Sequence, residues 1–216
     1  MSYKISDILK YRVKYTHNNK IIINKKNGKK VINPFYIKGL KIRFKGKNNT
    51  INLYEPLNFK RSLFTLKNDC EFNIYPAIIN NTTIHGYNSS FVTIEEGSEI
   101  GGLIVHMENE KNTTLHIDKD AVLSYNIQIW TTDTHPIFDL NTNQLINNSQ
   151  STVYIGKDTW ICANVILLKG AEIPTGSIVG NGSVVTKKFS ECNCVIAGNP
   201  AQIVKHNIYK KNGPIS

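Results

Sequence analysis

The sequence predicts a mainly β protein built as a parallel β-helix, and the strongest evidence is a six-residue repeat between residues 153 and 190. Aliphatic residues recur there every six positions, at Ile155, Ile161, Leu167, Ile173, Val179 and Val185. Compact or β-branched residues stand two positions before the later members, at Thr159, Val165, Ala171, Ser177 and Ser183. A period of six fits neither an α-helix nor a simple strand, but it fits a triangular coil with six residues on each face. We therefore expect each aliphatic side chain to point inward and to stack on its counterpart one coil later.

The first 114 residues follow this period poorly. Residues 1–40 are expected to cap the first coil, with a short helix from Ser6 to Lys14 and a hairpin that turns around Gly28. Residues 41–114 are expected to form irregular early coils with lengthened corners and a polar bulge at 106–114. The inward candidates in the early coils are Ile42, Ile51, Leu53, Phe64, Leu66, Phe72, Ile74, Ile84, Ile94 and Ile100.

Regular coils are predicted for residues 115–190, with one interruption. Ile117, Leu123 and Ile129 keep the six-residue spacing, and the next member would be His135. The polar segment 134–152 is instead predicted to leave the solenoid as a protruding loop, which is either functional or disordered. Residues 191–216 are expected to close the other end, with a short basic helix or tail over 201–211.

Composition narrows the range of partners. The chain has 216 residues, is 40% hydrophobic and carries a formal net charge of +10. This charge favours an anionic partner, although a solvated lysine-rich surface is an equally simple explanation. No basic strip interleaved with aromatic residues indicates nucleic-acid binding. Without a long apolar run or a signal peptide, a cytoplasmic protein without stable membrane insertion is expected.

Metal and disulfide chemistry are not expected from the sequence. Cys192 and Cys194 form an isolated CxC, and Cys70 and Cys162 are far from them, so reduced thiols are predicted. The spacing of the histidines gives no convincing ligand set, which disfavours a metal-dependent solenoid enzyme.

His135 and Trp160 are the two residues that break the repeat in a chemically useful way. A neutral imidazole near pH 7 can remove a proton from a hydroxyl, and Asp133 could orient the ring. The alternative is a loop histidine without a catalytic role. Trp160 stands where an outward side chain is expected, so its indole N–H could steady an oxyanion or its ring could stack on a sugar. Simple subunit packing is the alternative.

Four ordered motifs carry a resemblance to a known family: IGKDTWI from Ile155, LKGA from Leu168, GNGSVVTK from Gly180 and AGNPA from Ala197. They resemble the carboxy-terminal half of the left-handed β-helix (hexapeptide-repeat) acyltransferases. The segment TTDTHP that ends at His135 and Pro136 is similar to the capsular polysaccharide branch, in particular the bacterial polysialic acid O-acetyltransferases. The match covers roughly residues 115–205.

The resemblance implies a left-handed coil, a homotrimer with active sites between neighbouring subunits, and acetyl-CoA as acetyl donor. His135 matches the family's general base and Trp160 its GxxxW tryptophan. The positions that match the cofactor wall are Trp160, Ala163, Asn181, Thr186, Lys187, Gln202 and Lys205. Gln202 and Lys205 stand where related enzymes often have arginine.

We therefore expect an acetyl-CoA-dependent O-acetyltransferase that acts on a sugar hydroxyl of a bacterial surface polysaccharide, with sialic acid as a specific candidate. The enzyme is expected in the cytoplasm or peripherally at the inner membrane with the polysaccharide synthesis machinery. Two other functions stay open: an N-acetyltransferase acting on an amino sugar or nucleotide sugar, and a β-solenoid that only binds glycan or scaffolds an assembly.

Overall fold

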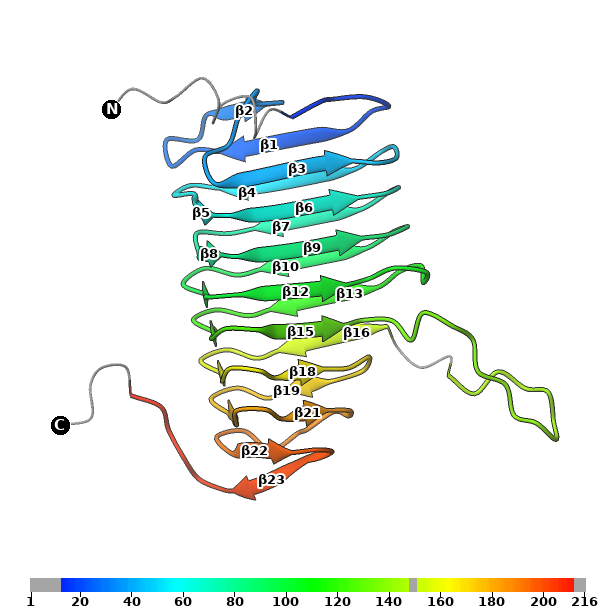
Figure 1. Ribbon diagram of the computed structural model, residues 1–216. Helices are drawn as coiled ribbons and strands as arrows, with labels where there is room; N and C mark the ends of the chain where they lie inside the picture. The colour runs from blue at the N-terminus through cyan, green and yellow to red at the C-terminus, as the bar shows by residue number, and fades with distance from the viewer. Residues whose placement is uncertain (1–12, 148–150, 212–216) are drawn as a thin grey trace.

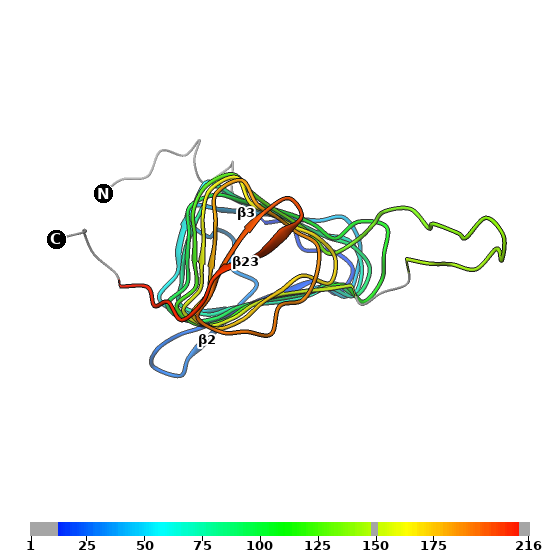
Figure 2. The same ribbon diagram turned by 90° about the horizontal axis from the view of Figure 1, so that it is seen from below.

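Three parallel β-sheets wind around one axis as a solenoid of about seven turns in the computed structural model, which describes residues 13–147 and 151–211 (Figure 1). Seen along the axis, the coils have a triangular outline, and one loop projects from a corner (Figure 2). The predicted parallel β-helix is confirmed. Within the described ranges the structure contains strands and no helix, and therefore no helix long and apolar enough to cross a bilayer.

The chain visits the three sheets in turn, so sequential strands belong to different faces of the triangle. Sheet 1 contains, in spatial order, β19 (Glu172–Ile173), β16 (Thr152–Ile155), β13 (Thr114–Ile117), β10 (Phe91–Ile94), β7 (Glu71–Ile74), β4 (Thr50–Tyr54), β1 (Lys20–Asn24) and β2 (Lys30–Ile32). Sheet 2 contains β23 (Ala201–Lys205), β22 (Val195–Gly198), β20 (Ile178–Val179), β17 (Trp160–Ile161), β14 (Val122–Leu123), β11 (Glu99–Ile100), β8 (Ile78–Asn80) and β5 (Asn58–Lys60). Sheet 3 contains β21 (Val184–Val185), β18 (Ile166–Leu167), β15 (Ile127–Trp130), β12 (Leu103–His106), β9 (Thr82–Gly86), β6 (Ser62–Leu66) and β3 (Leu40–Phe44).

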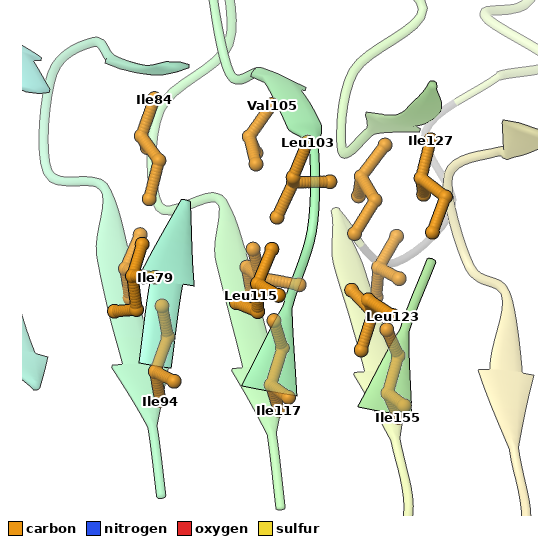
Figure 3. Packing of buried hydrophobic residues seen from close by; sticks show 14 of the residues in the cluster. Ile79, Ile84, Ile94, Leu103, Val105, Leu115, Ile117, Leu123, Ile127 and Ile155 are labelled. Carbon is orange, nitrogen blue, oxygen red and sulfur yellow. The ribbon is translucent and has the colours of Figure 1, made fainter. Parts of the chain in front are cut away.

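The core consists of columns of identical or similar hydrophobic residues, as the repeat predicted. The registers of sheets 1, 2 and 3 pair Ile155 with Ile173, Ile161 with Val179 and Leu167 with Val185. All six side chains have an exposed fraction of 0%. Figure 3 shows the same columns in earlier coils, where aliphatic side chains from the three sheets meet inside the triangle.

The protruding loop does not disturb the register of the coils around it. Ile117 of β13 pairs with Ile155 of β16, and Ile129 of β15 pairs with Leu167 of β18. Ile155 therefore takes the inward position that simple six-residue counting assigns to His135. The segment between β15 and β16 is an insertion at one corner, and this leaves its residues free to serve a purpose other than packing.

The early coils are more regular than their sequence suggests. All ten inward candidates are buried. The coils are longer here, because Glu71 pairs with Phe91, 20 residues on, whereas Tyr154 pairs with Glu172, 18 residues on. The extra residues lie at corners where asparagines such as Asn48 adopt a positive φ, which asparagine tolerates better than most residues.

The two ends differ in how well they were predicted. The hairpin around Gly28 is confirmed, since β1 and β2 pair antiparallel, and β1 also pairs in parallel with β4. The short helix expected from Ser6 lies mostly outside the described residues. Of the two forms predicted for 201–211, a short basic helix or a tail, the helix is wrong, because β22 and β23 form an antiparallel hairpin across the Gly198–Pro200 turn. β22 would otherwise leave an unpaired sheet edge, and the returning strand satisfies its backbone groups.

Candidate active site

The projecting loop starts at the corner where sheet 3 passes to sheet 1 (Figure 2). The last residues before it, Thr131 and Thr132, are buried, and the Thr131 N–H donates to the carbonyl of His106 at 3.1 Å. The Thr134 N–H then donates to Thr132 Oγ1 at 2.9 Å, and Thr134 has a φ of 62°. These contacts fix the direction in which the chain leaves the solenoid.

Stacked rings on sheet 3 support the root of the loop. The Trp130 ring lies 3.9 Å from that of His106, with an angle of 16° between their planes, and His85 lies one coil further along the same column. Burial lowers the pKa of the His106 imidazole below its ordinary value. A neutral His106 suits this position, because an uncharged ring stacks on its neighbours without desolvating a charge.

A buried lysine from the next coil anchors the loop. Lys169 follows β18 at the same corner, and its side chain has an exposed fraction of 5%. Its Nζ lies 3.0 Å from Glu110 Oε1, 3.2 Å from Asp133 Oδ2 and 2.9 Å from the carbonyl oxygen of Asn147. An ammonium group has three N–H donors, so each donor has an acceptor here.

Glu110 belongs to the connection between β12 and β13, the polar bulge of the sequence. Its Oε1 also accepts the Asp133 N–H at 3.0 Å, and its Oε2 accepts the Ser151 hydroxyl at 2.5 Å. Partial burial raises the pKa of the Glu110 carboxyl, but these hydrogen bonds and Lys169 outweigh the burial, so its pKa lies below the ordinary value. Glu110 is therefore held as a carboxylate that joins the two ends of the loop.

Asn147 connects the returning end of the loop to His135. Its Nδ2 donates to Asp133 Oδ2 at 3.1 Å and to the His135 carbonyl at 2.9 Å, and its Oδ1 accepts the Ile137 N–H at 2.9 Å. The His135 N–H donates to the carbonyl of Asp133 at 2.7 Å. The backbone of His135 is thus held on both sides, while its imidazole is exposed.

His135 lies beside a cavity of about 270 Å³ lined mainly by polar residues. The lining residues are Asn109, Glu110, Thr134, His135, Pro136, Leu145, Asn147, Ser151 and Lys169. A polar cavity beside an exposed imidazole can hold a hydroxylated ligand and accept a proton from it. The Asp133 carboxylate, which the sequence suggested as the group that orients the imidazole, contacts Lys169 and Asn147 instead.

Trp160 lies on a different face of the same chain. It begins β17 in sheet 2, between Val122 and Ile178 of the neighbouring strands, and 38% of its surface is exposed. Its Nε1 donates to Ser124 Oγ at 3.1 Å. A single protomer therefore presents His135 and Trp160 from separate corners of the triangle.

Comparison with known proteins identifies the family. The polysialic acid O-acetyltransferase of Neisseria meningitidis is 33% identical over 187 residues, covering 87% of this chain and 76% of that protein. The chain belongs to the hexapeptide-repeat β-helix acetyltransferases. The polysialic acid O-acetyltransferase of Escherichia coli is 31% identical over 138 residues, covering 62% of this chain but 44% of that longer protein. The crystal structure of the polySia specific acetyltransferase NeuO aligns with this chain over 93% of this chain and 88% of the NeuO chain, with 25% sequence identity and a TM-score of 0.78. No family model matches the chain.

The positions that resemble the cofactor wall of hexapeptide-repeat acetyltransferases form two groups in this chain. Ala163 and Asn181 share the corner between sheets 2 and 3, where the Gly182 N–H donates to the Ala163 carbonyl at 3.0 Å and Asn164 donates to Asn181 Oδ1 at 3.3 Å.

The second group lies near the last coil. Lys187 follows β21, and its Nζ lies 2.9 Å from Gln202 Oε1 on β23. Thr186, which precedes Lys187 in the sequence, and Lys205, which ends β23, are both exposed. The structure thus brings Lys187 and Gln202 together.

Sequence reasoning missed Glu110, Asn147 and Lys169, although a signal for the location of all three was present. The polar bulge, the loop and Lys169 follow strands of sheet 3 in three successive coils, so the repeat places them at one corner. Among the described residues, no three His, Cys, Asp or Glu side chains form a metal-binding group, and the four cysteines are unpaired.

Proposed function

We propose that this protein is an acetyl-CoA-dependent O-acetyltransferase that modifies a sugar hydroxyl of a bacterial surface polysaccharide, with sialic acid as the specific candidate. The observation that carries the proposal is the exposed His135 imidazole beside a polar cavity, on a loop whose backbone is fixed. Two relatives named polysialic acid O-acetyltransferases support this choice of reaction and acceptor.

In the proposed reaction, the His135 imidazole removes the proton from a sugar hydroxyl. The resulting oxygen nucleophile attacks the thioester carbonyl carbon, the carbon–sulfur bond breaks, and the CoA thiol leaves with the proton that His135 returns. General-base assistance of this kind contributes about 10²–10⁴-fold in rate. The Trp160 indole N–H or backbone N–H groups would stabilise the oxyanion of the tetrahedral intermediate.

This chemistry needs His135 and Trp160 at one site, and in a single chain they occupy different corners. We therefore propose a homotrimer of left-handed coils, in which the loop of one subunit reaches the sheet 2 face of its neighbour. Acetyl-CoA would lie in the groove between subunits, against Ala163 and Asn181 on one side and Lys187 near its phosphates. Thr186, Gln202 and Lys205 would complete the wall.

The charge distribution supports an anionic acceptor. Residues 1–70 contain 17 of the 26 Lys and Arg residues and 3 of the 16 Asp and Glu residues, so the excess of positive charge lies in the amino-terminal third of the sequence. A field of this sign raises the local concentration of an acidic polymer and speeds its association at low ionic strength. We propose that the enzyme acts in the cytoplasm or peripherally at the inner membrane.

The decisive experiment is acetyl transfer from acetyl-CoA to a panel of acidic and neutral glycans, with the product read by NMR. The wild-type protein should form an ester on an acidic glycan, and His135→Ala should lose about 10²–10⁴-fold in kcat while the trimer persists in sedimentation. Full activity of His135→Ala would refute the mechanism. An amide product would favour N-acetylation, and failure to bind CoA in calorimetry would favour a non-catalytic solenoid.

A further inference from the structure

Lys169 stands out because its charge is buried without being needed for the stacking of the coils. The core columns of the solenoid are hydrophobic, whereas lysines at other corners of the coils are exposed to solvent. Burial of an ammonium costs free energy unless every donor is satisfied, and a hydrophobic side chain would fill the same space at lower cost. A buried charge with complete pairing is most useful where it holds one particular arrangement of its partners.

The three partners of Lys169 belong to two connections, and Lys169 itself lies in a third. Glu110 lies between β12 and β13, Asp133 lies near the start of the loop, and Asn147 lies near its end. One ammonium group therefore fixes both ends of the segment that carries His135, and it does so from the next coil. Glu110 strengthens the arrangement, because it also accepts the N–H of Asp133 and the hydroxyl of Ser151.

The network reaches the backbone of His135 directly. The carbonyl of Asp133 accepts the His135 N–H, and the side chain of Asn147 donates to the His135 carbonyl. Movement of Asp133 or Asn147 would thus move the imidazole relative to the cavity. A displacement of about 1 Å at a reacting group is enough to cost about 10²-fold in rate.

We propose that Lys169 is a positioning residue: with Glu110, it holds the loop so that His135 presents its imidazole to the acceptor. The inference rests on the proposed acetyltransferase function. Lys169 lines the cavity, but its three N–H donors are already taken by Glu110, Asp133 and Asn147, so its proposed effect on the reaction is through the loop. Loss of Lys169 should therefore lower kcat and leave the affinity for acetyl-CoA nearly unchanged.

The test compares Lys169→Met, which keeps the length of the side chain and removes the charge, with Lys67→Met as a matched control. Lys67 also follows a strand of sheet 3 at the same corner and is half-buried, but its Nζ contacts the neutral hydroxyl of Tyr87 at 3.0 Å. Lys169→Met should lower kcat about 100-fold and change KM for acetyl-CoA less than about threefold. Lys67→Met should change neither.

Hydrogen exchange supplies a readout that does not depend on catalysis. In Lys169→Met, peptides within 133–147 should exchange about tenfold faster, while peptides of β13 keep their wild-type rate. If Lys169→Met does not fold, Glu110→Gln takes its place, because it removes the charge that pairs with Lys169, and the same pattern is expected.

A wild-type kcat in the folded variant, a loss confined to KM, or unchanged exchange in the loop would overturn the proposal. These outcomes differ from failure of the proposed function, in which the wild-type protein itself transfers no acetyl group. In that case the exchange comparison still decides whether Lys169 holds the loop.

Discussion

Complementation between two inactive variants is the sharpest prediction that follows from the positions of His135 and Trp160. His135 lies on the loop between β15 and β16, at the corner of sheets 3 and 1, and Trp160 begins β17 in sheet 2. Six residues per face at about 3.3 Å each put neighbouring corners about 20 Å apart. The loop also projects outward from its corner (Figure 2). A site that uses both side chains is therefore expected to take them from two subunits.

The expected activity follows from threefold symmetry. Consider trimers assembled from His135→Ala and Trp160→Ala subunits, where each site takes its histidine from one subunit and its tryptophan from the next. Whether a mixed trimer contains one or two copies of either variant, one of its three sites has both native residues. Mixed trimers should therefore show about one third of the wild-type rate per trimer, far above either parent.

The assay uses two affinity tags, one on each variant, co-expression, and purification over both tags in sequence so that mixed trimers alone are recovered. Acetyl transfer to the acidic glycan is then measured against both parent trimers. His135→Ala subunits that carry both tags serve as the control and should stay at background. Mixed trimers that also stay at background would refute the reasoning, because His135 and Trp160 would then not form a site across subunits.

Two further predictions concern the scaffold and the loop. Replacement of the fully buried Ile155 by alanine should lower the free energy of unfolding by about 2–5 kcal/mol. Ile137→Ala removes an exposed side chain of the loop and should change this free energy by less than about 0.5 kcal/mol. Guanidinium denaturation measures both variants, and equal effects would contradict the packing. The pKa of Glu110 lies below its ordinary value of 4.5, so its hold on the loop is complete above that pH and is lost as the pH falls through the lower pKa of the folded protein. Limited proteolysis of the loop should thus increase on acidification, and Glu110→Gln should be cleaved readily already at neutral pH; identical profiles of the two proteins would contradict this assignment.

The sequence predicted the scaffold well because the relevant information is local. A six-residue period states which side chains point inward, and the register confirms it from Ile117 through Ile155 to Ile173. It also located the insertion, since the period stops at Ile129 and resumes at Ile155. The carboxy-terminal hairpin was missed because a short run such as Ala201–Lys205 is compatible with a helix or a strand, and an open sheet edge decided between them.

The sequence by itself determined the repeating coil, the inward residues and the position of the loop, and its family resemblance made His135 the candidate general base. The tertiary structure decided how that group is held. Lys169 and Glu110 are 59 residues apart, and they meet with Asp133 because stacking of the coils brings three connections to one corner. It also decided that Trp160 lies on sheet 2, away from the corner that carries His135, since the place of an outward side chain depends on the face of the triangle that carries it. The repeat places these connections at one corner, but it does not specify which of their polar side chains pair, because those hydrogen bonds depend on the conformations of irregular segments.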